Sequence, residues 1–259
     1  MAGTGPDEGS RRSAVEIFQS VEDTAHEELR RSSRALMFSG IAGGLGMGLT
    51  GLAVASCRAI LGDSKPAEFI ALLFYPIGFI SVIIGRAQLF TENTLYPVAL
   101  ILSEHKHVIG TLRLWTVVFF SNIAGAVLFA FVAIKTGALH PEVANALVKL
   151  GETAANGDLR YVFWSGVIGG WIIALMAWIV TASHWTIGHF VVVYSLTVVV
   201  GMGHFAHCIA SSGEILSAVV AARLSVPHYA AWLATATMGN IFGGVTFVTV
   251  INFGQVTEQ

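Results

Sequence analysis

The chain has 259 residues, of which 54% are hydrophobic and only 12% are charged, and its mean hydropathy is +0.71. An ordinary soluble domain carries about 25% charged residues, so this composition predicts a protein whose main solvent is lipid. The formal net charge of -2 gives no indication of a nucleic-acid partner, which would need a basic stripe on one face. Cys57 and Cys208 lie within apolar stretches, where a thiol behaves as a small hydrophobe, and they predict no disulfide.

The N-terminal 34 residues hold many of the charges. From residue 13 to residue 34, apolar side chains are interspersed among acids and bases, which is typical of a weakly amphipathic helix. We expect residues 1–34 to form a cytoplasmic tail and amphipathic helix, and residues 35–259 to form the transmembrane domain. A solvated helix is the favoured interpretation, and docking on a partner is the alternative.

Four later stretches are uncharged and long enough, at about 20 residues, to cross the hydrocarbon core as helices. They are 35–57, 114–134, 161–183 and 229–253. Two further segments are interrupted by polar residues: 69–85 resumes at 95–103, and 185–203 resumes at 215–222. The chain therefore predicts an all-α membrane protein in which each half has a whole, an interrupted and a whole helix.

A short sequence repeat supports a duplication. Asn122-Ile123-Ala124-Gly125 follows the first break, and Asn240-Ile241-Phe242-Gly243 follows the second at a similar interval. Because three helices per half is an odd number, the second copy must insert upside down. Paired breaks in two such halves indicate a binding or permeation site at mid-membrane. The breaks must face protein or water, since each unpaired backbone group in lipid costs several kcal/mol.

A regular glycine spacing marks the first span. Gly40, Gly44 and Gly48 recur every fourth residue, the small-residue pattern of close helix contact. Whether this contact lies within one protomer or between protomers stays open at the level of sequence. Basic residues on the two sides do not decide the topology, but the cluster before the first helix favours an N-terminus on the inside.

The first break contains the polar run Thr91, Glu92 and Asn93, with Arg86 just before it. An ionisable residue within the membrane is a functional candidate because its burial is costly. The structural alternative is that Arg86, Glu92 and Glu214 are an internal ion pair or near-interface charges that hold the two breaks together.

The second break contains His204 and His207, which a continuous helix would place near the same face. Histidine has an ordinary pKa of about 6.5, so it can attract an anion or exchange a proton near neutrality. A redox protein with a metal or haem held by His189, His204 and His207 is the alternative of another class. These three share one segment, whereas haem ligands are normally spread over two helices, so we expect no metal or cofactor. Residues 104–107, Glu-His-Lys-His, are interpreted as a solvated loop, because nothing near them in sequence completes a ligand set.

Three runs together resemble the formate/nitrite transporter family over residues 35–255: Leu89-Phe90-Thr91, His207-Cys208-Ile209-Ala210, and 239–244, Gly-Asn-Ile-Phe-Gly-Gly. The Leu-Phe-Thr-Glu-Asn-Thr loop is similar to one branch of it. The resemblance implies an aquaporin-like six-helix bundle that assembles as a homopentamer in the cell inner (plasma) membrane. It also implies a cytoplasmic N-terminus and transport of a small monovalent anion such as formate, nitrite or hydrosulfide, often with a proton.

The resemblance also implies roles for individual residues. His207 matches the central pore histidine, Thr91 matches the loop hydroxyl, and Asn122 and Asn240 match asparagines near the break backbone. The positions that match a narrowed pore are Tyr75, Phe79, Leu89, Phe90 and Val200. The chain departs from the family pattern with Ala206 and Gly170, where many members have a glutamate and an asparagine. Glu92 and Glu214 leave open a channel for a cation or a small neutral solute, since acidic rings admit cations.

Overall fold

A computed structural model describes residues 12–258, which form helices and connecting turns without a β-strand. The expected tail at residues 1–11 lies outside the described residues. The elements are α1 (Ala14–Arg30), α2 (Ser33–Leu61), α3 (Lys65–Leu72), α4 (Ile77–Ile84), the 3-10 turn η1 (Glu92–Thr94), α5 (Tyr96–Glu104), α6 (Val108–Lys135), α7 (Pro141–Ala155), α8 (Leu159–Ala182), α9 (Thr186–Met202), α10 (Ala210–Val220), α11 (Val226–Gly244), the π-helix η2 (Val245–Val250) and α12 (Ile251–Thr257).

The all-helical membrane class predicted from the sequence is confirmed. Within the described residues, five helical segments are long and apolar enough to cross a membrane: 33–61, 65–84, 108–135, 159–182 and 226–257. The helices α9 and α10 are apolar but shorter. Large apolar side chains such as Phe120 and Ile109 are exposed on the outer surface, as expected where lipid replaces water.

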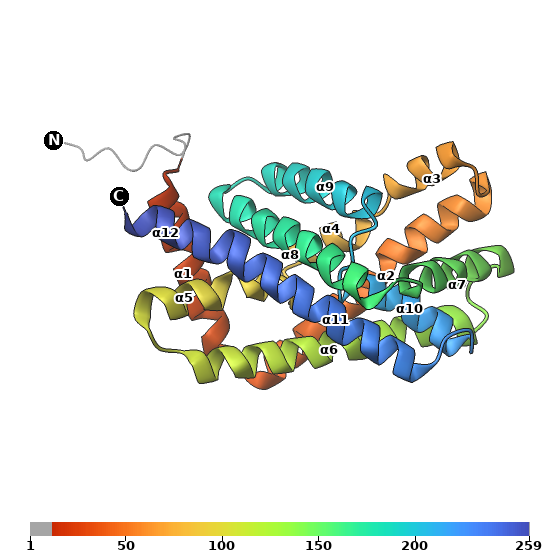
Figure 1. Ribbon diagram of the computed structural model, residues 1–259, viewed down its shortest axis with the longest axis horizontal. Helices are drawn as coiled ribbons and strands as arrows, with labels where there is room; N and C mark the ends of the chain where they lie inside the picture. The colour runs from red at the N-terminus through yellow and green to blue at the C-terminus, as the bar shows by residue number, and fades with distance from the viewer. Residues whose placement is uncertain (1–11, 259) are drawn as a thin grey trace.

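Two helix pairs form the frame of the molecule. The helix α2 packs along α6, and α8 packs along α11 (Figure 1). Each pair crosses where a side chain would not fit: a Cβ at Gly44 would overlap the carbonyl oxygen of Asn122, and a Cβ at Gly170 would overlap that of Asn240. Gly40 likewise meets Ser121 of α6, so the glycine stripe serves contact within one chain.

The two predicted interruptions are present and begin alike. One helix ends at Ile84 and the chain becomes helical again, as α5, at Tyr96, while the other ends at Met202 and resumes at Ala210. After each helix end, one residue takes the left-handed conformation, Arg86 with φ +57° and His204 with φ +48°.

The helix α7 was not predicted, and it lies between the two halves against α2 and α10. Its buried residues Leu147, Gly151 and Ala155 recur every fourth position, and Gly151 lets the backbone of α10 approach closely. A second unpredicted feature is the short turn at residues 73–76, which separates α3 from α4 before Pro76. The prediction of six segments is therefore incomplete. It relied on the length of apolar stretches, which does not detect helices as short as α3, α4 and α7.

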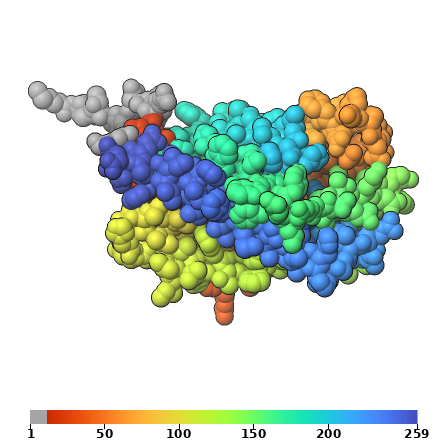
Figure 2. Space-filling model, viewed as in Figure 1, coloured from red at the N-terminus to blue at the C-terminus, as the bar shows by residue number. Residues whose placement is uncertain are grey.

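The amphipathic α1 was expected to be solvated, but it packs on its own chain. Phe18, Val21 and Ala25 are buried, and α1 contacts α5, α8 and α12. The helices α1, α5 and α12 lie at one end of the molecule, whereas α3 and α7 lie at the other (Figures 1 and 2).

Candidate functional site

The centre of the site is a contact between the two breaks. The Nε2 atom of His207 lies 2.8 Å from the Oγ1 atom of Thr91, and both residues are fully buried. The Nδ1 atom of His207 accepts hydrogen bonds from the backbone N–H groups of Ala210, at 2.9 Å, and Ile209, at 3.3 Å. Because a backbone N–H can only donate, the neutral ring carries its proton on Nε2 and donates it to Thr91. The Thr91 hydroxyl then accepts from the ring, and within the described residues its own hydrogen has no side-chain or backbone acceptor.

Aromatic rings from α4 and the preceding turn lie beside this contact. The Phe79 ring meets His207 edge-on, with centroids 5.2 Å apart, and the Tyr75 ring follows at 5.8 Å from Phe79. Phe79 is fully buried, while Tyr75 and Val200 face the cavity described below. The structure therefore places these three predicted constriction residues around one region.

The apolar residues of the first break are also buried, but Phe90 has different neighbours. Leu89 is inaccessible to solvent. The Phe90 ring packs edge-on against Trp115 and Phe119 of α6, with centroids 5.7 and 5.1 Å away. Trp115 also donates a hydrogen bond from Nε1 to the backbone oxygen of Asn93, at 2.8 Å. Phe90 and Asn93 thus help to fix the loop against α6.

Asn122 fastens the first break to its surroundings. Its Oδ1 atom accepts from the backbone N–H of Phe90 at 2.9 Å. Its Nδ2 group donates to the carbonyl oxygens of Gln88, at 2.8 Å, and Gly40, at 2.7 Å. One buried amide therefore satisfies two backbone groups of the break, from Gln88 and Phe90, and ties them to the Gly40 carbonyl of α2.

Asn240 repeats this arrangement at the second break. Its Oδ1 atom accepts from the N–H of Cys208 at 2.9 Å, and its Nδ2 group donates to Ala206, at 2.9 Å, and Gly166, at 2.8 Å. In both breaks the asparagine bonds a carbonyl and the N–H two residues later. The repeated Asn-Ile pattern therefore corresponds to a repeated clamp.

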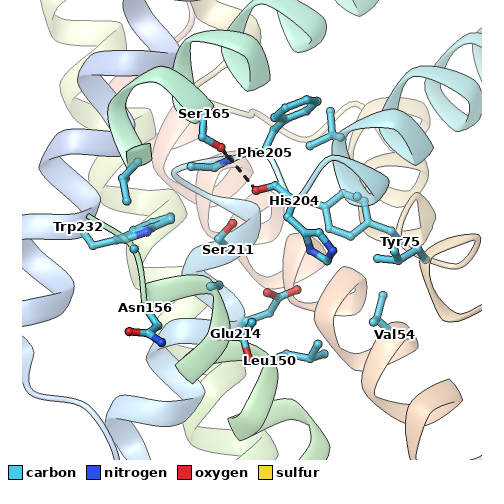
Figure 3. Close-up of a pocket in the computed structure, with 18 of the residues that line it drawn as sticks. Val54, Tyr75, Leu150, Asn156, Ser165, His204, Phe205, Ser211, Glu214 and Trp232 are labelled. Atoms are coloured by element: carbon cyan, nitrogen blue, oxygen red, sulfur yellow. Dashed lines mark hydrogen bonds between the residues drawn. The ribbon is translucent and has the colours of Figure 1, made fainter. Parts of the chain in front are cut away.

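A cavity of about 380 Å³ opens beside the second break (Figure 3). Its lining includes four residues predicted as site residues, which are Tyr75, Val200, His204 and Glu214. It also includes Arg58 and Glu68, which were not predicted. The His204 ring and the Glu214 carboxylate point into this space (Figure 3).

The expectation that His204 and His207 share a face is wrong. The chain is not helical between Gly203 and Ile209, so the angular spacing of a helix does not apply. The His204 side chain is 59% exposed, and its Nε2 atom lies 3.8 Å from the Oε1 atom of Glu68, whereas His207 is buried at the breaks.

The internal ion pair considered as one structural alternative is contradicted. Among residues 12–258, no salt bridge joins Arg86, Glu92 and Glu214, and Arg86 is exposed. Arg86 takes the left-handed backbone conformation just after α4, and the two acids lie in different breaks. Glu214 is only 8% exposed and borders the cavity.

Two residues that sequence reasoning missed, Ser165 and Arg58, line the cavity beside the second break. The Ser165 hydroxyl on α8 accepts from the N–H of Ala206 at 3.0 Å, and nothing in the sequence distinguishes it from other small helix residues. Arg58 at the end of α2 lies 3.7 Å from Glu68, and its position at the end of an apolar run was an available signal.

The three histidines considered as metal or haem ligands do not meet. His189 bonds the backbone oxygen of Ser183 at 2.8 Å, His204 faces the cavity and His207 bonds Thr91. In the described part of the chain, the side chains that could together hold a metal ion are those of His26, Glu104 and His107, which lie away from this site.

The family model described as "Formate/nitrite transporter" matches residues 15–254 of the chain. The inner membrane protein YfdC of Escherichia coli (strain K12) is 31% identical over 250 residues, which cover 95% of this chain and 80% of that protein. A probable formate transporter of Methanothermobacter thermautotrophicus is 29% identical over 212 residues, covering 72% of this chain and 75% of the relative.

Two solved structures share the fold. An FNT family ion channel superposes with a TM-score of 0.83 at 15% identity, covering 93% of this chain and 98% of that one. A pentameric formate channel with formate bound gives a TM-score of 0.75 at 18% identity, covering 88% and 98%.

Proposed function

Because the chain belongs to the formate/nitrite transporter family, we propose that it is a membrane channel for a small monovalent anion or its weak acid. Formate, nitrite and hydrosulfide are the solutes of this class. The observation that carries the proposal is the buried contact of 2.8 Å between Thr91 and His207, which joins the two breaks.

The proposed mechanism assigns the solute contact to Thr91. With the His207 proton on Nε2, the Thr91 hydroxyl accepts from the ring and donates its own hydrogen to a solute oxygen or sulfur. Leu89 and Phe79 exclude hydrated ions, and a solute that crosses as the neutral acid avoids most of the cost of desolvating a charge.

We assign proton exchange chiefly to His204. A second proton on His207 would have to sit on Nδ1, which would break the bonds from Ala210 and Ile209. His204 is exposed in the cavity, where its ring is accessible to water and to a solute. His207 then acts as a neutral ring that orients Thr91.

We further propose the aquaporin-like arrangement of six helices in two inverted halves, with a cytoplasmic N-terminal segment up to residue 34 and a channel domain from residue 35. The matching clamps of Asn122 and Asn240 support the two halves. The likeness to a pentameric formate channel supports a homopentamer, and the relative named an inner membrane protein supports that location. The mass of the purified complex in detergent tests the assembly: five chains are expected, and a monomer or trimer would contradict it.

A cation or a small neutral solute is the second candidate, favoured by one observation. Glu214 borders the cavity, and no cationic side chain pairs with it among residues 12–258. A carboxylate in such a place attracts cations.

Reversal potentials across a planar bilayer separate the two candidates. With a gradient of sodium formate, passage as the anion predicts a potential near the formate equilibrium value, and passage as the neutral acid predicts no formate current. Neither result should change in Glu214→Gln or Glu92→Gln. A potential near the sodium equilibrium value that shifts in Glu214→Gln would contradict the anion proposal and support a cation channel.

A further inference from the structure

Two histidines and a glutamate meet at the end of the molecule formed by α1, α5 and α12. His26 lies on α1, Glu104 is the last residue of α5, and His107 directly precedes α6. The Nε2 atom of His26 lies 2.8 Å from the Oε1 atom of Glu104, and the Nε2 atom of His107 lies 2.9 Å from Oε2. The carboxylate thus lies between two imidazoles that come from different elements.

This cluster has the ligand set and spacing of a transition-metal site. One ligand atom from each residue lies within 4.8 Å of the others, and the three side chains are about one-third exposed, at 35, 27 and 28%. Zinc is held at about 2.0–2.2 Å by histidine nitrogen and carboxylate oxygen. Small side-chain rotations would bring these atoms to that distance from a common centre, with an open position left for water.

We propose that His26, Glu104 and His107 bind one divalent first-row transition ion, for which Zn²⁺ is the reference. Two imidazoles favour zinc, nickel or copper over magnesium and calcium, which prefer oxygen ligands. The ion would replace the hydrogen bonds that now join the three side chains.

Two neighbouring residues affect this site. Lys106 competes with an ion for the Glu104 carboxylate, and Arg113 holds the end of α1 independently of an ion. The Nζ atom of Lys106 lies 2.9 Å from the Oε2 atom of Glu104, and its side chain is 66% exposed, so it can leave when an ion arrives. Arg113 of α6 donates to the backbone oxygens of Leu29 and Arg31, at 2.7 and 3.1 Å. The C-terminal end of α1 is therefore docked without the ion, and the ion adds a second tie between α1 and α5.

Calorimetric titration of the untagged full-length protein, stripped of metal and in detergent, tests the site. We expect one Zn²⁺ per chain above background and no comparable binding of Mg²⁺. His26→Asn and His107→Asn should each weaken Zn²⁺ binding by at least about tenfold, because loss of even an indirect support of a metal costs that much. Lys106→Ala should strengthen binding, which a purely structural hydrogen-bond network would not do.

His105→Asn is the matched control. His105 lies in the same turn as His107, takes the same left-handed conformation as His107 and is exposed. The variant should keep wild-type affinity. Because a variant could fold poorly, the Zn²⁺-dependent rise in melting temperature of the wild type provides a second measurement, expected to vanish in the His26→Asn/His107→Asn double variant. Equal Zn²⁺ binding by wild type and double variant, or equal losses in His105→Asn and His107→Asn, would overturn the proposal.

Discussion

At the residue scale, Asn122 and Asn240 show how a helix can be interrupted inside a membrane. Each amide satisfies one carbonyl and one N–H of a break and also bonds a carbonyl of a neighbouring helix, Gly40 of α2 or Gly166 of α8, so these break groups need no water. The sequence predicted both residues, because the Asn-Ile pattern recurs after each break. It did not predict Ser165, whose hydroxyl completes the second break from a helix without any local signal.

Replacing Asn122 or Asn240 by alanine should destabilise the protein to a similar extent. Each substitution leaves buried backbone groups unsatisfied, at about 1–3 kcal/mol for such a group. Thermal unfolding in detergent measures the effect. Asn252→Ala is the control, since its amide makes one bond, to Val248 near the chain end, and should have little effect. A stable Asn240→Ala would contradict the repeated clamp.

His207→Asn should fold and lose flux. The asparagine oxygen can still accept from Ala210, but the N–H donated to Thr91 disappears. Uptake of formate into proteoliposomes should fall up to about tenfold, because the lost hydrogen bond to Thr91 contributes about 0.5–1.5 kcal/mol and about 1.4 kcal/mol corresponds to a factor of ten. His140→Asn, at an exposed site on the α7 cap, should not change uptake.

The two histidines also make opposite predictions about pH. His204→Asn should flatten the pH dependence of uptake, whereas His207→Asn should lower uptake at every pH. If His207→Asn flattened the pH dependence and His204→Asn lowered uptake at every pH, proton exchange would be assigned to His207 instead. Sequence alone placed the two histidines on one face, because it could not show that the backbone leaves the helix at Gly203.

At the scale of elements, close helix crossings fix the frame. Gly44→Ala should force α2 away from the Asn122 carbonyl and so reduce both thermal stability and the yield of folded protein. Gly254→Ala near the C-terminus is the matched control, because a Cβ there meets nothing within 4 Å. Equal behaviour of the two variants in thermal unfolding would show that the crossing tolerates separation.

The start of α1 offers a test that depends on pH. Ser13 and Glu16 form a reciprocal cap, and the bond from the Ser13 backbone N–H is the main cause that lowers the pKa of Glu16. Ser13→Ala should destabilise the helix end by about 1 kcal/mol, seen as faster hydrogen exchange in α1. Since the folded pKa is lowered, the contribution of Glu16 is complete above its ordinary value and is lost as pH falls through the lowered one.

Elements differed in how well they could be predicted. The long spans and both breaks followed from apolar length and from polar interruptions. The helix α7 did not, because it is amphipathic and short, and its partners α2 and α10 are distant in sequence. His26 and Glu104 are brought together only by the packing of α1 on α5, which no local pattern indicates.

At the scale of the whole molecule, the central claim is that the protein passes a small anion or its weak acid across the membrane. Proteoliposomes that contain the purified protein should take up formate or nitrite faster at the lower of two pH values, and should admit neither potassium nor glycerol. The two breaks, joined by Thr91 and His207, carry this expectation. Passage of potassium or glycerol without passage of either anion would contradict the account.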